Sequence, residues 1–407
     1  MTYDDVLSEI VVKTPARIVL FVIDGVGGLP METGGPTELE AADTPHLDAL
    51  AQRSICGMMD PLAPGITPGS GPAHLALFGY DPFRKSVGRG VLAALGIGFD
   101  LHPSDVAVRI NFATINEKGV ITDRRAGRIP TAKNEQLCTL LQLLVLPEVE
   151  LFVRSVREHR AVAIFRGEGL SGRVTDSDPQ QSGLAPHDVA PVVGEEQNPA
   201  AQKMARTANN FVREARRILS DHAPANFILL RGFDQYTPMP SMRERYKLDC
   251  AAIAVYPMYR GVARLAGMEI LPTGETVVDE VRTLVRHFET FTFFFVHVKK
   301  TDAAGEDGDF KRKVNAIEEV DRILPEVLSA EPDVLAITGD HSTPALLKAH
   351  SWHPVPFLLH SRYCRPDPAK RFSESECVRR GGLGRFPASQ VMPLVLAHAL
   401  KLKKYGA

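Results

Sequence analysis

Short runs of consecutive apolar residues recur along the chain, separated by stretches in which apolar positions repeat every three or four residues. The first run spans residues 17–24, ends in Asp24 and is followed by a glycine-rich turn. Such runs, rich in β-branched residues and bounded by turn residues, are typical of strands buried in a parallel sheet. Further strands are predicted at residues 106–110, 161–165, 227–230, 251–255, 291–298, 334–338 and 355–359.

Helical periodicity lies between several of these predicted strands. Apolar residues spaced by three or four positions between Val314 and Val327 predict a helix, which Pro325 is expected to kink or end. Residues 180–201, rich in Pro, Gly, Gln and Asp without a period, predict a long loop. Strands alternating with helices indicate an α/β fold, a mostly parallel sheet sandwiched by helices.

Composition excludes several classes of protein. The 407 residues include 47 basic and 49 acidic ones without a dense basic run, which argues against a nucleic-acid-binding protein. Five widely spaced cysteines without a C-x-x-C pair argue against a disulfide framework and a cysteine zinc site. The acidic N-terminus lacks a signal-peptide pattern, and no apolar run approaches the roughly 20 residues that span a bilayer. We therefore expect a cytoplasmic protein without a membrane partner.

Acidic residues and histidines gather at or just after predicted strand ends. Asp24, Asp302 and Asp340 each occupy such a position, and His341 follows Asp340 directly. Further candidates are Glu306, His350 and His353. One aspartate alone would more often cap a turn or helix, but carboxylates and imidazoles at several strand ends together suit one or two divalent metal ions. Two such ions can hold both the entering and the leaving oxygen of a displacement.

One serine lies in a predicted loop between two glycines, which have no side chains. Ser70 stands between Gly69 and Gly71, in a pattern that is neither the G-x-S-x-G elbow nor a Walker A loop. A metal ion would activate its hydroxyl as a nucleophile. The alternative is a simple Gly/Pro turn that contains a polar residue.

Arginines form a third candidate set. Arg124, Arg125 and Arg128 lie within five residues, and their guanidinium groups match the geometry of phosphate and carboxylate. A solvated surface loop would also account for them. Other cationic candidates beside strand ends or glycines are His159, Arg166, Arg231 and Arg260.

Together these residues resemble the alkaline-phosphatase superfamily, and within it the archaeal-type cofactor-independent phosphoglycerate mutases. The resemblance covers nearly the whole chain. It is carried by Asp24-Gly, the loop from Ser70 to His74 that runs into Leu-Phe-Gly-Tyr-Asp81-Pro, Asp302-x-x-x-Glu306, Asp340-His341, His350-x-x-x-Pro-Val-Pro, Asn111-Phe-Ala-Thr114, Asp123 to Arg128, Asp176-Ser-Asp-Pro179 and Gly261 to Met268.

The resemblance implies an alkaline-phosphatase-like metal-binding domain interrupted by a smaller α/β (α+β) domain that binds substrate. The metal-binding domain would comprise residues 1–102 and 238–407, and the inserted domain residues 103–237. One metal ion would take Asp24, Ser70, Asp340 and His341, and the other would take Asp302, Glu306 and His350. Related enzymes often have histidine at position 306, so Glu306 shifts the expected preference toward Mn²⁺ or Mg²⁺ and away from Zn²⁺, with Co²⁺ also compatible.

The implied reaction interconverts 3-phosphoglycerate and 2-phosphoglycerate in glycolysis or gluconeogenesis, without 2,3-bisphosphoglycerate. Ser70 would carry a phosphoserine intermediate, and closure of the inserted domain would exclude water. Substrate-binding candidates are Arg124, Arg125, His159, Arg166, Arg231 and Arg260. The alternatives are a metal-dependent phosphomonoesterase, a phosphopentomutase-like enzyme, or a non-catalytic binding protein that has lost a metal at Glu306. The sequence leaves the role of His353 and the oligomeric state open.

Overall fold

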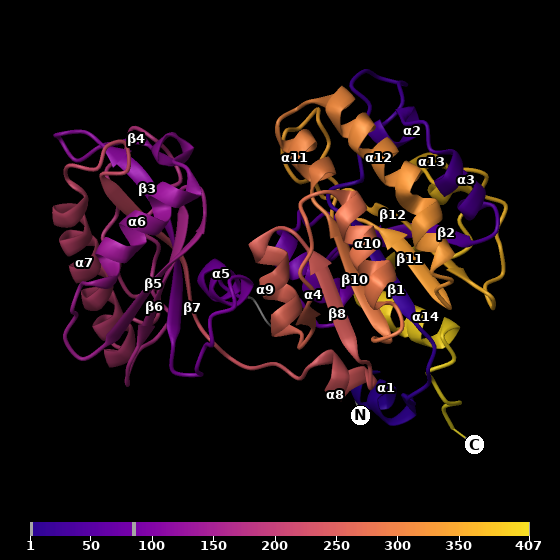
Figure 1. The fold of residues 1–407 in the computed structure, drawn as a ribbon, viewed down its shortest axis with the longest axis horizontal. Coiled ribbons are helices and arrows are strands. Elements are labelled where there is room, and N and C mark those ends of the chain that lie inside the picture. The colour runs from indigo at the N-terminus through magenta and orange to yellow at the C-terminus, as the bar shows by residue number, and fades with distance from the viewer. Residues whose placement is uncertain (1–2, 84–86, 407) are drawn as a thin grey trace. The chain divides into compact units, whose positions relative to one another are not determined.

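The chain divides into two compact units in the computed structural model, which describes residues 3–83 and 87–406. Unit 1 consists of Met1–Ser86 and Pro240–Ala407, and unit 2 of Val87–Met239. Unit 2 is therefore an insertion between two segments of unit 1 (Figure 1).

Unit 1 is built on an eight-stranded sheet with the order β13-β2-β12-β11-β1-β10-β8-β9. The central strands β11, β1, β10 and β8 are parallel, whereas β12 is antiparallel to both of its neighbours, so the prediction of a mostly parallel sheet is confirmed. The strands are β1 (Ile18–Ile23), β2 (Ile55–Asp60), β8 (Cys250–Ala254), β9 (Glu269–Ile270), β10 (Phe293–Val298), β11 (Val334–Thr338), β12 (Val355–Ser361) and β13 (Arg385–Pro387).

The central strand β1 is buried along its whole length, as its unbroken apolar run predicts. Ile18 pairs with Phe293 on one side and with Val334 on the other. The helices of unit 1 are α1 (Tyr3–Ile10), α2 (Glu38–Ala41), α3 (Pro45–Ala51), α4 (Ser70–Leu77), α8 (Met242–Tyr246), α9 (Pro257–Leu265), α10 (Val277–His287), α11 (Lys300–Glu306), α12 (Phe310–Ser329), α13 (Glu374–Arg380) and α14 (Val391–His398), with a 3₁₀ turn at Ala388–Gln390.

Helix α12 continues through Pro325 to Ser329, so this proline does not end the helix, and the kink stays a prediction. Proline removes one backbone donor from the helical ladder, at a cost that packing can offset. Leu324 and Val327, on either side of it, are buried in the core of unit 1. Tertiary burial therefore overrides the local preference at this position.

Unit 2 contains a five-stranded sheet in the order β4-β3-β6-β5, with β7 also paired to β3. All of these pairings are antiparallel. Alternate residues of β3, from Val106 to Phe112, share a core with α6 and α7. Its elements are α5 (Arg89–Gly96), β3 (Val106–Ile115), β4 (Ile121–Asp123), a 3₁₀ turn (Ala126–Arg128), α6 (Thr131–Gln142), β5 (Glu150–Arg157), β6 (Arg160–Arg166), α7 (Pro199–Leu219) and β7 (Phe227–Gln235).

Two boundaries in unit 2 differ from the sequence-based expectation. The unit begins at Val87 rather than at residue 103, because α5 packs against β3 and β7. A Cβ atom at Gly90 would lie only 2.2 Å from the carbonyl oxygen of Ala107, so the helix lies directly against the strand. The predicted long loop ends at Asn198, whose side chain accepts a hydrogen bond from the Ala200 amide and caps α7.

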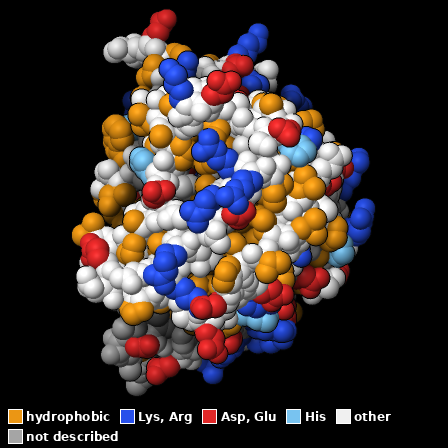
Figure 2. Space-filling model, turned by 90° about the vertical axis from the view of Figure 1, so that its left-hand side faces the viewer, with side chains coloured by type: hydrophobic (Ala, Val, Ile, Leu, Met, Phe, Trp, Pro, Cys, Tyr) orange, Lys and Arg blue, Asp and Glu red, His pale blue; other side chains and the backbone are white. Residues whose placement is uncertain are grey.

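The molecular surface carries charges of both signs. On the face drawn in Figure 2, basic and acidic side chains are interspersed with apolar ones. Among the helices of the described residues, none combines the length and the apolar character that a membrane crossing requires.

Candidate metal centre and active site

Neighbouring parallel strands bring the predicted ligands together at one edge of the sheet of unit 1. Asp24 follows β1, and Asp340 and His341 follow β11. Asp302 lies in the first turn of α11, just beyond β10. Because β11, β1 and β10 are adjacent and parallel, their carboxyl ends share one edge, where α/β proteins place their ligands.

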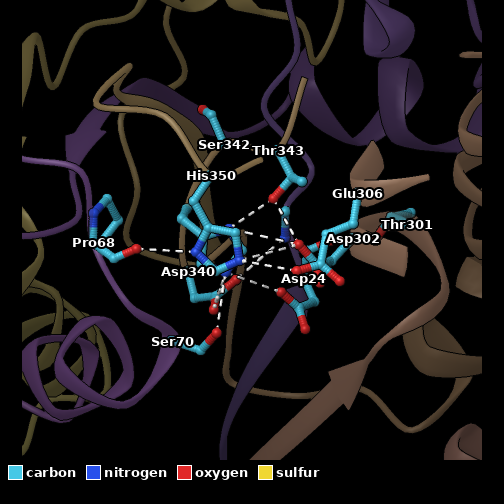
Figure 3. A network of polar contacts seen from close by, with 12 residues as sticks. Asp24, Pro68, Ser70, Thr301, Asp302, Glu306, Asp340, Ser342, Thr343 and His350 are labelled. Carbon is cyan, nitrogen blue, oxygen red and sulfur yellow. Dashed lines mark hydrogen bonds and ion pairs between the residues drawn. The ribbon is translucent and has the colours of Figure 1, made fainter. Parts of the chain in front are cut away.

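Two groups of side chains converge there (Figure 3). Asp24, Asp340 and His341 form one, and Asp302, His341 and His350 form the other. Within each group the potential ligand atoms lie within 4.8 Å of one another. Asp24, Asp302, Asp340 and His341 are fully buried.

Ser70 is the first residue of α4, and its hydroxyl faces the first group. Its Oγ lies 3.3 Å from Nε2 of His341. The preceding Gly69 has an extended backbone and brings the chain into the helix without a side chain. His74, one turn later, hydrogen-bonds through Nδ1 to the Ser70 carbonyl oxygen at 2.7 Å. The serine that the sequence singled out is thus fixed beside the converging carboxylates.

His350 is oriented toward the second group by a backbone contact. Its Nδ1 hydrogen-bonds to the carbonyl oxygen of Pro68 at 2.9 Å, so its Nε2 faces Asp302 Oδ1 at 3.6 Å. Its ring stacks on His341, with 3.6 Å between the centroids.

Glu306 and His353 are not members of either converging group. The carboxylate of Glu306, 54% exposed at the end of α11, lies 3.9 Å from Nε2 of His350. Glu306 lies near the second group, but it is not among the residues whose ligand atoms converge within 4.8 Å. His353 bonds through Nδ1 to the Ser351 hydroxyl at 3.0 Å and stacks on Trp352.

The donor set fits a divalent cation. Oδ1 of Asp24 and Oδ2 of Asp340 are buried without a hydrogen-bond donor, and they face His341 Nε2 at 3.4 and 3.1 Å. Burial lowers the pKa of His341, but the attraction of Asp340, Asp24 and Asp302 outweighs it and raises the pKa to about 9. Carboxylates that draw a positive charge this strongly into a buried site suit a hard or borderline metal ion.

The predicted cationic residues of unit 2 separate into two places. His159, almost fully buried, begins the turn into β6, and Arg166 ends that strand. At about 3.3 Å per residue the two lie roughly 20 Å apart. Arg166 forms a two-bond ion pair with buried Asp105, at 2.8 and 2.7 Å. Arg166 is thus held at the end of β6 that lies away from His159.

Arg125 and Arg128, together with Arg160 and Arg109, lie near His159. Burial, followed by the charges of Arg160, Arg125, Arg128 and Arg109, lowers the pKa of this histidine to about 3, so its ring is neutral. Arg124 is held by two hydrogen bonds to Asp178, at 2.9 and 2.6 Å. Arg231 donates to Gln180 at 2.5 Å. Several cations fixed around a neutral imidazole form a candidate anion site in this unit.

Arg260 belongs to unit 1, where it lies on α9. Its Nε donates to the carbonyl oxygen of Ala254 at 2.7 Å, so the side chain covers the carboxyl end of β8. It is thus at the ligand-bearing edge of the sheet.

Comparison with known proteins agrees with this geometry. A family model described as 2,3-bisphosphoglycerate-independent phosphoglycerate mutase matches residues 51–226. A protein of Thermus thermophilus named "probable 2,3-bisphosphoglycerate-independent phosphoglycerate mutase" is 52% identical over 407 residues and covers 99% of both chains. This chain belongs to the 2,3-bisphosphoglycerate-independent phosphoglycerate mutase family.

Solved structures resemble this family member along nearly its whole length. A protein of Pyrococcus horikoshii is 31% identical with a TM-score of 0.82, over 96% of this chain and 99% of its own. A cofactor-independent phosphoglycerate mutase of Thermoplasma acidophilum is also 31% identical, with a TM-score of 0.69, over 94% and 100%. The family members are isomerases, which makes this chain an enzyme of that class.

Lys299 and Tyr259 also lie in the centre of this mutase family member, and sequence reasoning missed them. The Lys299 ammonium lies 3.1 Å from Oδ2 of Asp24 and contacts Oδ2 of Asp302 at short range. The Tyr259 hydroxyl donates to Oδ2 of Asp24 at 2.5 Å. Burial raises the pKa of Asp24, but Lys299 and two histidines, His297 and His341, outweigh burial and hold it well below its usual value. Lys299 could have been found from the sequence because it directly follows a predicted strand, whereas no sequence pattern marks Tyr259.

Proposed function

We propose that this enzyme interconverts 3-phosphoglycerate and 2-phosphoglycerate through a phosphoserine on Ser70, in glycolysis or gluconeogenesis. Family membership supports the reaction. The observation that carries the proposal is the position of the Ser70 hydroxyl, 3.3 Å from Nε2 of a histidine that converges with Asp24 and Asp340. A serine in that position can act as a nucleophile only beside a group that stabilises its oxyanion.

Two divalent ions fit the residues of this centre. We assign Asp24, Ser70, Asp340 and His341 to one ion. Asp302, Glu306 and His350 are assigned to the other. The ions would lower the pKa of the serine hydroxyl and neutralise charge on the transferring phosphoryl group. The mixture of carboxylates and imidazoles favours Mn²⁺, and Zn²⁺, Co²⁺ and Mg²⁺ are also compatible.

The reaction requires two displacements at phosphorus. The Ser70 hydroxyl gives up its proton, Oγ bonds to phosphorus in line, and the bond from phosphorus to the 3-oxygen breaks as that oxygen takes up a proton. The 2-hydroxyl of the retained glycerate then gives up its proton and bonds to phosphorus, and the bond from phosphorus to Oγ of Ser70 breaks as Oγ regains a proton. His74 hydrogen-bonds to the carbonyl of Ser70, which supports the position of the nucleophile.

Retention of glycerate distinguishes a mutase from a phosphatase. We assign Arg124, Arg125, Arg166, Arg231 and Arg260 to the carboxylate and phosphate of the substrate. Asp178 orients Arg124 and Asp105 orients Arg166, each through two hydrogen bonds. His159 is neutral and is the candidate to exchange protons with the glycerate hydroxyls once a bound anion offsets its arginine neighbours.

A coupled assay with 3-phosphoglycerate tests the proposal. The purified enzyme is loaded with Mn²⁺, Zn²⁺, Co²⁺ or Mg²⁺ in turn, with and without 2,3-bisphosphoglycerate. We expect 2-phosphoglycerate as the product, independent of the bisphosphate. Release of inorganic phosphate instead would identify a metal-dependent phosphomonoesterase and overturn the proposal.

A further inference from the structure

His341 lies close enough to both candidate metal groups to belong to either. It converges with Asp24 and Asp340 on one side and with Asp302 and His350 on the other. When His341 binds a metal ion its imidazole is neutral, with one nitrogen that carries a proton and one that binds the ion. The nitrogen that carries the proton therefore decides which group the residue joins.

The Thr343 hydroxyl decides the position of that proton (Figure 3). It donates to Oδ1 of Asp302 at 2.7 Å, and an ionised carboxylate can only accept. The remaining lone pair of the Thr343 oxygen faces Nδ1 of His341 at 2.9 Å, so this nitrogen must be the donor. Nε2 is left to bind a cation, and it faces Asp24, Asp340 and the hydroxyl of Ser70.

The backbone of Thr343 is fixed from several sides. Its amide donates to the Gly27 carbonyl at 3.0 Å, and its own carbonyl accepts from the buried Lys313 ammonium at 2.9 Å. Lys313 also donates to the carbonyl of Gly27 at 2.9 Å, which ties the loop after β1 to the loop after β11. A Cβ atom on Gly305 would lie 2.1 Å from the Thr343 carbonyl oxygen, so α11 also packs directly on this residue. The hydroxyl is thereby held in one place.

We propose that Thr343 is a positioning residue that keeps the two metal groups separate. Its hydroxyl directs Nε2 of His341 to the group of Asp24 and leaves Asp302 and His350 to the second ion. Without the hydroxyl, nothing holds the proton on Nδ1, which lies 4.0 Å from Oδ1 of Asp302. Nε2 of His341 could then carry the proton, and the ion of the Asp24 group would lose this ligand. This inference rests on the proposed two-ion centre but not on the proposed reaction.

Direct titration of the full-length protein with Mn²⁺, after removal of bound metal by a chelator, tests the inference without using activity. Wild type should bind two ions. Thr343→Val, which is nearly isosteric, should weaken one of them by roughly 10–100-fold, the usual cost of losing an outer-shell partner. Thr343→Ser, which retains the hydroxyl, should bind both ions within about threefold of wild type.

A matched control separates this role from general stability. Thr283 is also buried, and its hydroxyl donates to the Asp279 carbonyl at 2.9 Å, away from all metal candidates. Thr283→Val should therefore bind both ions normally. If Thr343→Val does not fold, Thr343→Ala replaces it as the hydroxyl-free variant.

Each outcome of these titrations decides a different claim. Two ions bound with wild-type affinity by Thr343→Val, or loss of an ion in Thr343→Ser, would overturn the inference and leave the proposed reaction intact. A wild-type protein that binds fewer than two ions would overturn the proposed centre and the inference together. A protein that loads two ions but lacks mutase activity would contradict the reaction alone.

Discussion

Lys299 places a positive charge between the two candidate metal groups. Its ammonium contacts one carboxylate of each group, Asp24 and Asp302, while 29% of the side chain remains exposed. Burial lowers the pKa of Lys299, but Asp24, Tyr259 and Asp302 outweigh this and raise it well above its usual value. The residue is therefore a permanent cation at the centre, and it competes with metal ions for two of their ligands.

Replacement of Lys299 by methionine should strengthen metal binding. At about 4 Å, two unit charges interact by roughly 1–4 kcal/mol at effective dielectric constants of 80 to 20, so we expect Mn²⁺ affinity to rise by roughly 5–1,000-fold. Titration calorimetry of Lys299→Met would measure it. Lys300→Met is the matched control, because Lys300 pairs with Glu319 instead and should leave the affinity unchanged. A lower affinity in Lys299→Met would show that the lysine supports metal binding rather than competing with it.

Replacement of Ser70 by alanine should abolish turnover. Loss of the nucleophile should lower kcat by at least roughly 10³-fold in the coupled mutase assay, because the Ser70 hydroxyl beside His341 is the group that would carry the phosphoryl intermediate. Ser54→Ala is a suitable control, since that hydroxyl bonds to the Leu50 carbonyl at 2.6 Å. Normal rates in Ser70→Ala would exclude the phosphoserine route.

The sequence marked ligands most clearly where a residue lies at or just after the end of a strand. Asp24, Asp340 and His341 are of this kind, and the structure brings them together. Tyr259 and Thr343 were not foreseen, because hydroxyl groups carry no periodic signature and act through partners distant in sequence. Glu306 was placed by resemblance, and its exposed carboxylate lies at the margin of the second group.

At the level of elements, the order of the strands explains how the site forms. Strands β11, β1, β10 and β8 are parallel neighbours, and α11 begins directly after β10. Predicted strands at residues 334–338 and 355–359 match β11 and β12 closely, because unbroken apolar runs identify buried strands well. Strand β5 was not predicted, since its mixture of charged and apolar residues suits a partly exposed position. Neither the sheet order nor the reversed direction of β12 follows from local sequence.

Helix α10 carries a buried acid that should make stability depend on pH. Burial raises the pKa of Glu280 to about 8, although Lys300 and a hydrogen bond from the Val255 backbone oppose the shift. Because folding raises the pKa of the Glu280 carboxyl, its full contribution to the free energy of unfolding is present below the ordinary pKa of 4.5. That contribution is lost as the pH rises through about 8.

Glu280→Gln should remove this dependence. Compared with the variant, wild type should lose up to roughly 5 kcal/mol of unfolding free energy between pH 4.5 and pH 9, at about 1.4 kcal/mol per pKa unit. Denaturant unfolding at several pH values would measure the difference. Glu289→Gln, at an 81% exposed side chain, is the control. Parallel pH profiles for wild type and Glu280→Gln would contradict the assignment.

At the scale of the whole molecule, the insertion divides the chain into units that differ in how local their contacts are. The core shared by β3, α6 and α7 lies entirely within unit 2. The sheet of unit 1, by contrast, joins residues before the insertion to residues after it. The family resemblance of the sequence indicated an inserted domain. The residue at which this domain starts depends on how α5 packs, and no local sequence pattern reveals that packing.

Unit 2 should fold when it is produced alone. A fragment of residues 87–239 retains all strand partners of its sheet, so we expect cooperative thermal unfolding by circular dichroism and a dispersed amide NMR spectrum. Residues 1–86 alone should remain unfolded, because β1 then lacks both neighbours. A random-coil spectrum for the 87–239 fragment would show that its stability depends on unit 1.

The pairing of β1 also has a consequence for protein synthesis. Ile18 lies between Phe293 and Val334, so the ribosome makes the central strand long before either of its partners. At about 5–20 residues per second, this apolar strand would wait on the order of tens of seconds for its first neighbour, while the inserted unit is made and folds. A nascent chain that exposes such a strand is a natural client for a chaperone, and recombinant yield should depend on the speed of translation and on chaperone supply.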